Sequence, residues 1–253
     1  MSNLIDNIFL WTKNKISKKI LKFYNQNNYC IVNFIYFANL HKFIIDKKDK
    51  KYSQALENWN FLLPDGIALK IYLKNKYKKT LKENLNWTDF TPYFINFLKK
   101  NNNINLAIYT VYDEKIWKTK NDVKKVEKYI KDNFKINNIT SFVSHYKNRW
   151  KDFNFLEYKK TLQNNKINLF LVWIGSPFQE IWTIENKDFF KENNILVINV
   201  WWLFDFWSNF EKRAPKLFLK LNLEWLRRFR QNPKKNYKKV IESFKLFKEI
   251  LKK

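Results

Sequence analysis

Residues 167–175 read INLFLVWIG, and residues 195–200 read ILVINV. Both runs are nearly all apolar, which is typical of strands that are buried on both faces. Strands of this kind lie at the centre of parallel sheets that helices cover on both sides. The two runs therefore predict the middle of a parallel sheet.

The neighbouring sequence alternates short apolar runs with longer amphipathic stretches. The other strand-like runs are residues 30–37, 61–63, 104–111 and 139–144, and helical spacing of apolar residues covers 40–58, 67–79, 89–100, 113–134, 153–164 and 177–193. This alternation predicts an α/β fold, a Rossmann-like and mostly parallel sheet with helices on both faces. Ligands of such sheets bind beyond the carboxyl ends of the strands.

The sequence changes in character near residue 205. Residues 211–253 hold 15 Lys and Arg against four Glu, and their apolar residues recur at helical spacing before and after Pro233. That pattern predicts two basic amphipathic helices and no further strand. We therefore expect a Rossmann-like domain over residues 1–205 and a basic helical C-terminal appendage over residues 206–253.

The whole chain is strongly basic, with 49 Lys and Arg against 23 Asp and Glu and a net charge of +26. Such a charge indicates an anionic partner, which is nucleic acid, an anionic membrane surface or a phosphorylated substrate. A second explanation for part of the lysine excess is an AT-rich genome, which enriches Lys, Asn, Ile and Phe. One cysteine and two histidines argue against a disulfide framework and a Cys/His zinc site.

No apolar run approaches the roughly 20 residues that span a bilayer. Lysines also interrupt the first 30 residues, so these lack the apolar core of a signal peptide. We expect a cytoplasmic protein whose contact with membrane is peripheral.

Polar residues that follow the predicted strands are the candidates for chemistry. Asn39 and His41 follow the first strand, and Asp65 follows the second within a Pro-Asp-Gly turn. A single Asp before Gly is a turn residue as readily as a base. Neither His41 nor His145 has partners for a metal site.

Two further candidates lie where helices are expected to begin. Thr88 and Asp89 precede an apolar helical run, as an N-cap does. Residues 175–180, GSPFQE, follow the most apolar strand and bring Gln179 and Glu180 near a helix N-terminus, where anions bind. Gln179 is also open to interpretation as an exposed residue of the first helical turn.

With these segments in view, the chain resembles the WecG/TagA/CpsF family of bacterial glycosyltransferases. The resemblance rests on LPDGI at 63–67, TDF at 88–90, GSPFQEIW at 175–182, FDF at 204–206, KRAP at 212–215, LEWLRR at 223–228 and Pro233. Their order and spacing hold from about Val32 to Lys235. Each motif alone is weak, whereas the ordered set is specific.

The resemblance implies an inverting transferase that needs no metal and no cofactor. Its donor would be a UDP-linked N-acetylmannosamine, the uronic acid of that sugar or a related sugar. Its acceptor would be a polyprenyl-diphosphate-linked sugar at the inner membrane face, and a homo-oligomer is possible. Asp65 matches the family's candidate base, which deprotonates the attacking hydroxyl.

The resemblance also assigns substrate contacts. Arg213 and Arg228 would stabilise the departing UDP diphosphate. Asn39 and Gln179 would hold sugar or acceptor, within a set that also includes Thr88, Asp89, Gly175 and Glu180.

Several positions depart from the family pattern. Phe37 replaces a common Thr, Asn84 stands near a common Arg, and Lys234-Lys235 replaces a pair of arginines that would grip phosphate in bidentate fashion.

The chain has two glycines and eleven tryptophans. Trp87, Trp173, Trp201 and Trp202 occupy positions where the family has glycine, whereas Trp182 and Trp225 match family tryptophans. We therefore hypothesise that several Trp codons are UGA codons that the source organism reads as glycine.

Two alternatives stay open at this point. One is a non-catalytic basic protein that binds nucleic acid or an anionic membrane surface, although candidates tied to strand ends favour the transferase and no nucleic-acid partner. The other is a catalytically inactive membrane-surface scaffold of the same fold.

Overall fold

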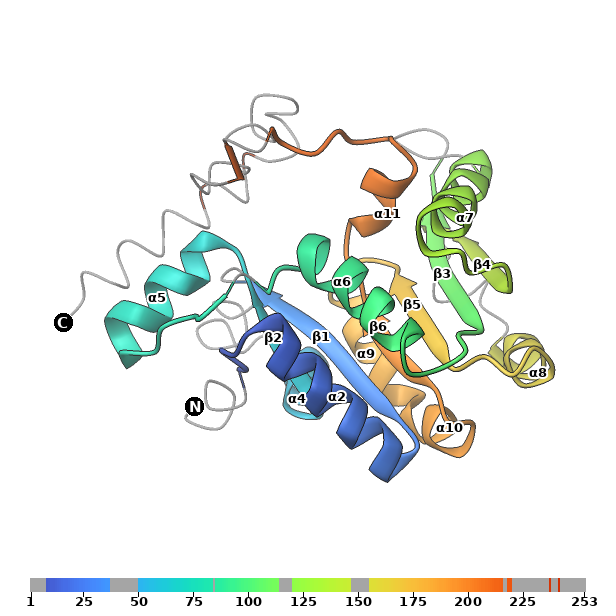
Figure 1. Ribbon diagram of the computed structural model, residues 1–253, viewed down its shortest axis with the longest axis horizontal. Coiled ribbons are helices and arrows are strands. Elements are labelled where there is room, and N and C mark those ends of the chain that lie inside the picture. The colour runs from blue at the N-terminus through green and yellow to red at the C-terminus, as the bar shows by residue number, and fades with distance from the viewer. Residues whose placement is uncertain are drawn as a thin grey trace.

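The computed structural model describes residues 8–36, 50–83, 85–113, 120–146 and 155–215, together with Phe218, Leu219, Tyr237 and Ile241. Its six strands are β1 (Cys30–Tyr36), β2 (Phe61–Asp65), β3 (Leu106–Tyr112), β4 (Ile139–His145), β5 (Leu169–Trp173) and β6 (Leu196–Asn199). They form one parallel sheet in the order β2-β1-β6-β5-β3-β4 (Figure 1). The predicted α/β fold with a parallel sheet is confirmed.

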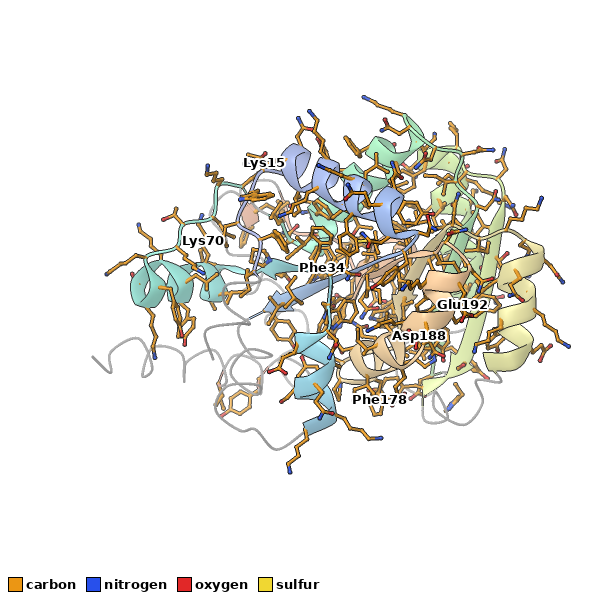
Figure 2. All side chains as sticks on the ribbon, turned by 90° about the horizontal axis from the view of Figure 1, so that it is seen from below. Lys15, Phe34, Lys70, Phe178, Asp188 and Glu192 are labelled. Atoms are coloured by element: carbon orange, nitrogen blue, oxygen red, sulfur yellow. The ribbon has the colours of Figure 1, made fainter. Side chains whose placement is uncertain are left out.

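Helices cover the sheet on both faces, as predicted. They are α2 (Lys13–Asn27), α4 (Lys50–Glu57), α5 (Ile67–Tyr77), α6 (Trp87–Lys99), α7 (Lys120–Phe134), α8 (Phe155–Asn164), α9 (Phe178–Glu185), α10 (Lys187–Glu192) and α11 (Leu203–Trp207). Helices α2 and α6 lie on one face, and α4, α9 and α10 lie on the other (Figure 1). Figure 2 shows the same layers, with Lys15 of α2 on one side of Phe34 and Phe178 and Asp188 on the other.

The two most apolar runs form the central strands. Strand β5 pairs with β3 and β6, and β6 pairs with β5 and β1. Every residue of both strands is buried. Each buried aliphatic or aromatic side chain contributes about 1.5–3 kcal/mol on leaving water, so these strands are strongly driven into the core.

Several helix boundaries differ from the sequence predictions. The helix expected over residues 177–193 is two helices, α9 and α10, which meet at Asn186. Asp113, expected to begin a helix, instead continues the extended segment after β3, and the described part of that helix is α7. Helices α2 and α11 were not predicted.

The reason for missing α2 lies in its composition. It carries five lysines and buries only Ile16, Ser17 and Ile20, one narrow stripe against the sheet and α6. Thr12 caps it, with Oγ1 accepting from the Lys15 amide at 3.4 Å. The helical spacing of its apolar residues is therefore present, but the many lysines make it hard to recognise in the sequence.

Candidate functional site

Asp65 is the last residue of β2, at the carboxyl edge of the sheet. It lies opposite Tyr36, the last residue of β1, in the register of the two strands. Its side chain is half-buried, so a ligand at this edge can reach it. Gly66 follows with φ +84°, a conformation that favours glycine, and α5 begins directly after it.

Pro64 lies inside β2 rather than in a turn after it. A proline fits there because β2 is the edge strand of the sheet, where a missing amide donor breaks no ladder. The sequence prediction that Asp65 stands at the mouth of the sheet is consistent with this placement.

A second part of the edge is the turn from β5 into α9. Gly175 makes this turn at φ +85°, and its carbonyl accepts from the Gln179 amide at 3.0 Å. Gln179 and Glu180 occupy the first turn of α9, as predicted. The alternative of an exposed Gln179 is wrong, because both side chains are completely buried.

Gln179 and Glu180 belong to a buried polar cluster between α9 and the sheet. Gln179 Nε2 donates to Glu180 Oε1 at 3.2 Å, and Thr183 Oγ1 donates to Asn199 Oδ1 at 3.2 Å. Asn33 of β1 is fully buried as well. Sequence reasoning missed Asn33, Thr183 and Asn199, although an Asn inside an otherwise apolar strand run marks two of them.

Burial sets the protonation of this cluster. Loss of water around the carboxyl raises the pKa of Glu180 to about 7, and the polar side chains of Ser176, Gln179 and Asn33 oppose that rise by favouring the charged form. Glu180 therefore changes charge near neutral pH, inside the protein.

A third part of the edge is the N-terminus of α6. Arg213 Nη2 forms an ion pair with Asp89 and donates to Thr88 Oγ1 at 3.3 Å. The structure thus brings three predicted site residues together, although Arg213 is more than 120 positions away along the chain. About a third of the Arg213 side chain is exposed, so a phosphate has access to the guanidinium.

The predicted cap of α6 is wrong by two residues. Asn86 is the N-cap, and its Oδ1 accepts from the Asp89 amide at 2.9 Å and from Thr88 Oγ1 at 3.0 Å. Thr88 and Asp89 lie in the first helical turn instead. There Asp89 complements the positive end of the helix dipole.

Aromatic side chains fill the space between these parts. Trp201 follows β6, and its ring meets that of Tyr36 edge-on at a centroid distance of 4.9 Å. Trp87 stacks on Phe206 of α11 at 5.8 Å. The carboxyl edge is therefore partly closed by rings.

Four other residues named from the sequence cannot be placed in the site. Asn39, His41, Asn84 and Arg228 lie outside the described residues. His145 ends β4 and contacts the ring of Tyr112 at 5.2 Å. Within the described ranges no group of three or more His, Cys, Asp or Glu side chains is arranged to hold a metal.

A surface hollow of about 280 Å³ lies at the opposite edge of the sheet. Its lining comes from the end of α6, the residues before β3 and the residues between α7 and β4, including Lys99, Asn105 and Lys135. The sheet separates it from Asp65, so it forms no part of the site.

The order of these site residues along the chain agrees with a known family. The sequence matches the glycosyl transferase WecG/TagA/CpsF family over residues 5–253. The chain belongs to this family. A comparison with curated proteins gave no match.

Membership of the glycosyl transferase WecG/TagA/CpsF family identifies a transferase with a sugar donor and an acceptor. Among the helices of the described ranges, none has both the length and the apolar character needed to cross a membrane.

Proposed function

We propose that this protein is an inverting, metal-independent transferase. It moves an N-acetylhexosamine-type sugar from a UDP donor to a polyprenyl-diphosphate-linked acceptor, in the synthesis of a cell-surface polysaccharide. The observation that carries the proposal is that an accessible carboxylate, a glycine turn into α9 and a guanidinium at the start of α6 all lie at the carboxyl edge of the sheet. The carboxylate can act as the base, and the guanidinium can stabilise the departing diphosphate.

Asp65 is the proposed catalytic base. Its carboxylate takes the proton of the acceptor hydroxyl as that oxygen attacks the anomeric carbon of the donor. A new glycosidic C–O bond forms on one face while the bond from the anomeric carbon to the diphosphate oxygen breaks on the other. The bonding electrons leave with UDP, and the sugar inverts.

The departing diphosphate carries the charge that must be stabilised. Arg213 is suited to this because a guanidinium binds two phosphate oxygens at once, and its partner Asp89 leaves part of it exposed. The N-termini of α6 and α9 add the positive ends of two helix dipoles. Arg228 is proposed as a second cation.

The remaining candidates are proposed to shape the sugar site. Gly175 gives the turn that brings α9 to the edge, and the buried Gln179 and Glu180 hold that turn from beneath. Thr88 helps to orient Arg213. Asn39 is proposed to contact the acceptor.

The C-terminal appendage, residues 206–253, is proposed to bind the inner membrane face and so to deliver the lipid-linked acceptor. Its 15 basic residues from position 211 onward are suited to anionic lipid headgroups. The catalytic domain, residues 1–205, would then work in the cytoplasm at the membrane surface.

The most direct test is a donor screen. The purified chain would be given different UDP-sugars and a short-chain lipid-diphosphate-GlcNAc acceptor, with release of UDP as the readout. Acceptor-dependent release with one N-acetylhexosamine donor supports the proposal. Binding of nucleic acid that weakens steeply with salt, without binding of any UDP-sugar, contradicts it.

A second candidate is an inactive scaffold of the same fold at the membrane surface. The ring of Trp201 favours it, because this ring stands against Tyr36, next to Asp65. Binding to liposomes without UDP binding, in a chain with glycine at position 201, would distinguish the scaffold from the transferase.

A further inference from the structure

Trp201 has a backbone conformation that does not suit tryptophan. Its φ is +47°, in the left-handed region. The other described non-glycine residues with positive φ are Asn28, Asn194, Asn209, Lys78, Lys135 and Lys166. Asparagine tolerates this region, whereas for a bulky residue it is an outlier.

The side chain of Trp201 is poorly accommodated as well. The residue is 6% exposed, and its indole Nε1 is buried with no hydrogen-bond partner among the described residues. A buried indole N–H normally finds a partner. At position 201, both the backbone conformation and the side-chain environment are therefore unfavourable for tryptophan.

Both conflicts disappear if the residue is glycine. Glycine adopts positive φ without steric strain and has no N–H to bury. The composition points the same way, because a sheet-and-helix protein with two glycines and eleven tryptophans lacks glycine where turns need it. The tryptophan codon UGG differs from UGA in one base, and UGA is read as tryptophan in some genetic codes and as glycine in others.

The backbone separates Trp201 from the other tryptophans. Trp87 begins a helix, Trp173 ends a strand and Trp202 has φ −89°, so none of these positions requires glycine. Trp182 lies inside α9 and packs on Tyr109 at 5.4 Å, as a core tryptophan does.

The indole also lies close to the proposed catalytic base. The Trp201 ring contacts Tyr36, and Tyr36 stands opposite Asp65 in the strand register. Removing the ring leaves a hollow beside β1, one strand from the carboxylate.

We propose that position 201 is glycine in the working enzyme, encoded by UGA, and that the space occupied by the indole is the entrance for the sugar diphosphate. The first half rests on the backbone conformation, the buried indole N–H and the composition. The second half rests on the proposed function.

Mass spectrometry of the protein purified from its own organism tests the first half. Trypsin releases residues 192–212, and fragment ions within this peptide identify residue 201. We expect glycine there and tryptophan at position 182 in the peptide 167–187. Tryptophan at position 201 overturns the proposal.

Two variants of the full recombinant chain, Trp201→Gly and Trp201→Ala, give an independent measurement. Both remove the ring, but only glycine relaxes the backbone. We expect the unfolding equilibrium constant of the alanine variant to be larger by about fivefold, because alanine is strained at positive φ. Equal stability, or a more stable alanine variant, contradicts the requirement for glycine.

Calorimetry with UDP tests the entrance. The glycine variant is expected to bind UDP at least about tenfold more tightly than the tryptophan chain. If glycine is found in the native protein and the glycine variant still fails to bind UDP, the assignment of residue 201 stands. If both chains bind UDP equally well, only the proposed entrance is overturned, whereas no UDP binding by either chain contradicts the UDP-dependent function.

Discussion

At the scale of single residues, Asp65 is the side chain on which the proposed chemistry depends. Replacing Asp65 with Asn keeps the shape of the side chain and removes the basic oxygen. We expect turnover to fall by about 10²–10⁴-fold, the usual contribution of general base catalysis, with UDP binding nearly unchanged. UDP release and calorimetry measure the two effects.

The matched control is Asp188→Asn, which makes the same chemical change on the exposed surface of α10. Normal turnover is expected for it. If Asp65→Asn also turns over normally, Asp65 is not the base.

Glu180 gives a prediction about pH. Its pKa is raised from 4.5 to about 7, so between these pH values the folded state binds more proton than the unfolded state. The contribution of Glu180 to stability is therefore fully present below pH 4.5 and is lost as pH rises through 7, by about 3 kcal/mol in the free energy of unfolding.

Urea unfolding of the wild type and of Glu180→Gln at pH 5 and pH 8 measures this effect. The stability difference between the two proteins is expected to move in favour of the Gln variant at pH 8. A difference that does not change with pH would show that Glu180 titrates normally.

At the scale of elements, the N-terminus of α6 links helix capping to the site. Asn86 accepts hydrogen bonds from Thr88 and Asp89, the two residues that bind Arg213. We expect Asn86→Ala to destabilise the protein by about 1–2 kcal/mol, and to weaken UDP binding because Arg213 loses its fixed position.

Thr12→Ala removes the cap of α2 and serves as the comparison. The Thr12 hydrogen bond is 3.4 Å long and exposed, so a smaller loss of stability and no change in UDP binding are expected. If the two variants change UDP binding equally, the α6 cap does not fix the position of Arg213 for UDP binding.

Strands were easier to predict from the sequence than contacts between distant residues. All six strands were predicted, and the central β5 and β6 most directly, because a buried parallel strand needs a continuous apolar run, which is visible without partners. The pairing of Arg213 with Asp89 was not predictable, because it arises from the path of the chain after β6 and not from any local pattern. The complete burial of Gln179 was not predicted either, because which face of α9 packs against the sheet is decided by tertiary packing and not by the local sequence.

At the scale of the whole molecule, the division into domain and appendage gives a prediction. A chain that ends at Asn209 loses Arg213 and the basic tail, whereas one that ends at Pro215 keeps the Arg213–Asp89 ion pair. Both are expected to lose binding to anionic liposomes, because each lysine or arginine near such a surface contributes about 1 kcal/mol.

UDP binding is expected to distinguish the two truncations, with the longer chain retaining most of it. Liposome sedimentation and calorimetry provide the measurements. Full liposome binding by the chain that ends at Asn209 would mean that the appendage is not the membrane contact.

Strand order has a consequence for how the protein is made. Strand β6 joins the pair β2-β1 to the trio β5-β3-β4, and of the described strands it is the last to be synthesised. During translation, the first 195 residues can form two separate half-sheets, each with an apolar edge that β6 later covers. Cys30 of β1 pairs with Leu196 of β6, and contacts between residues so far apart in the sequence form slowly. Until they form, the unpaired strand edges can pair with other chains and aggregate. We therefore expect the nascent chain to be most prone to aggregation until β6 has left the ribosome.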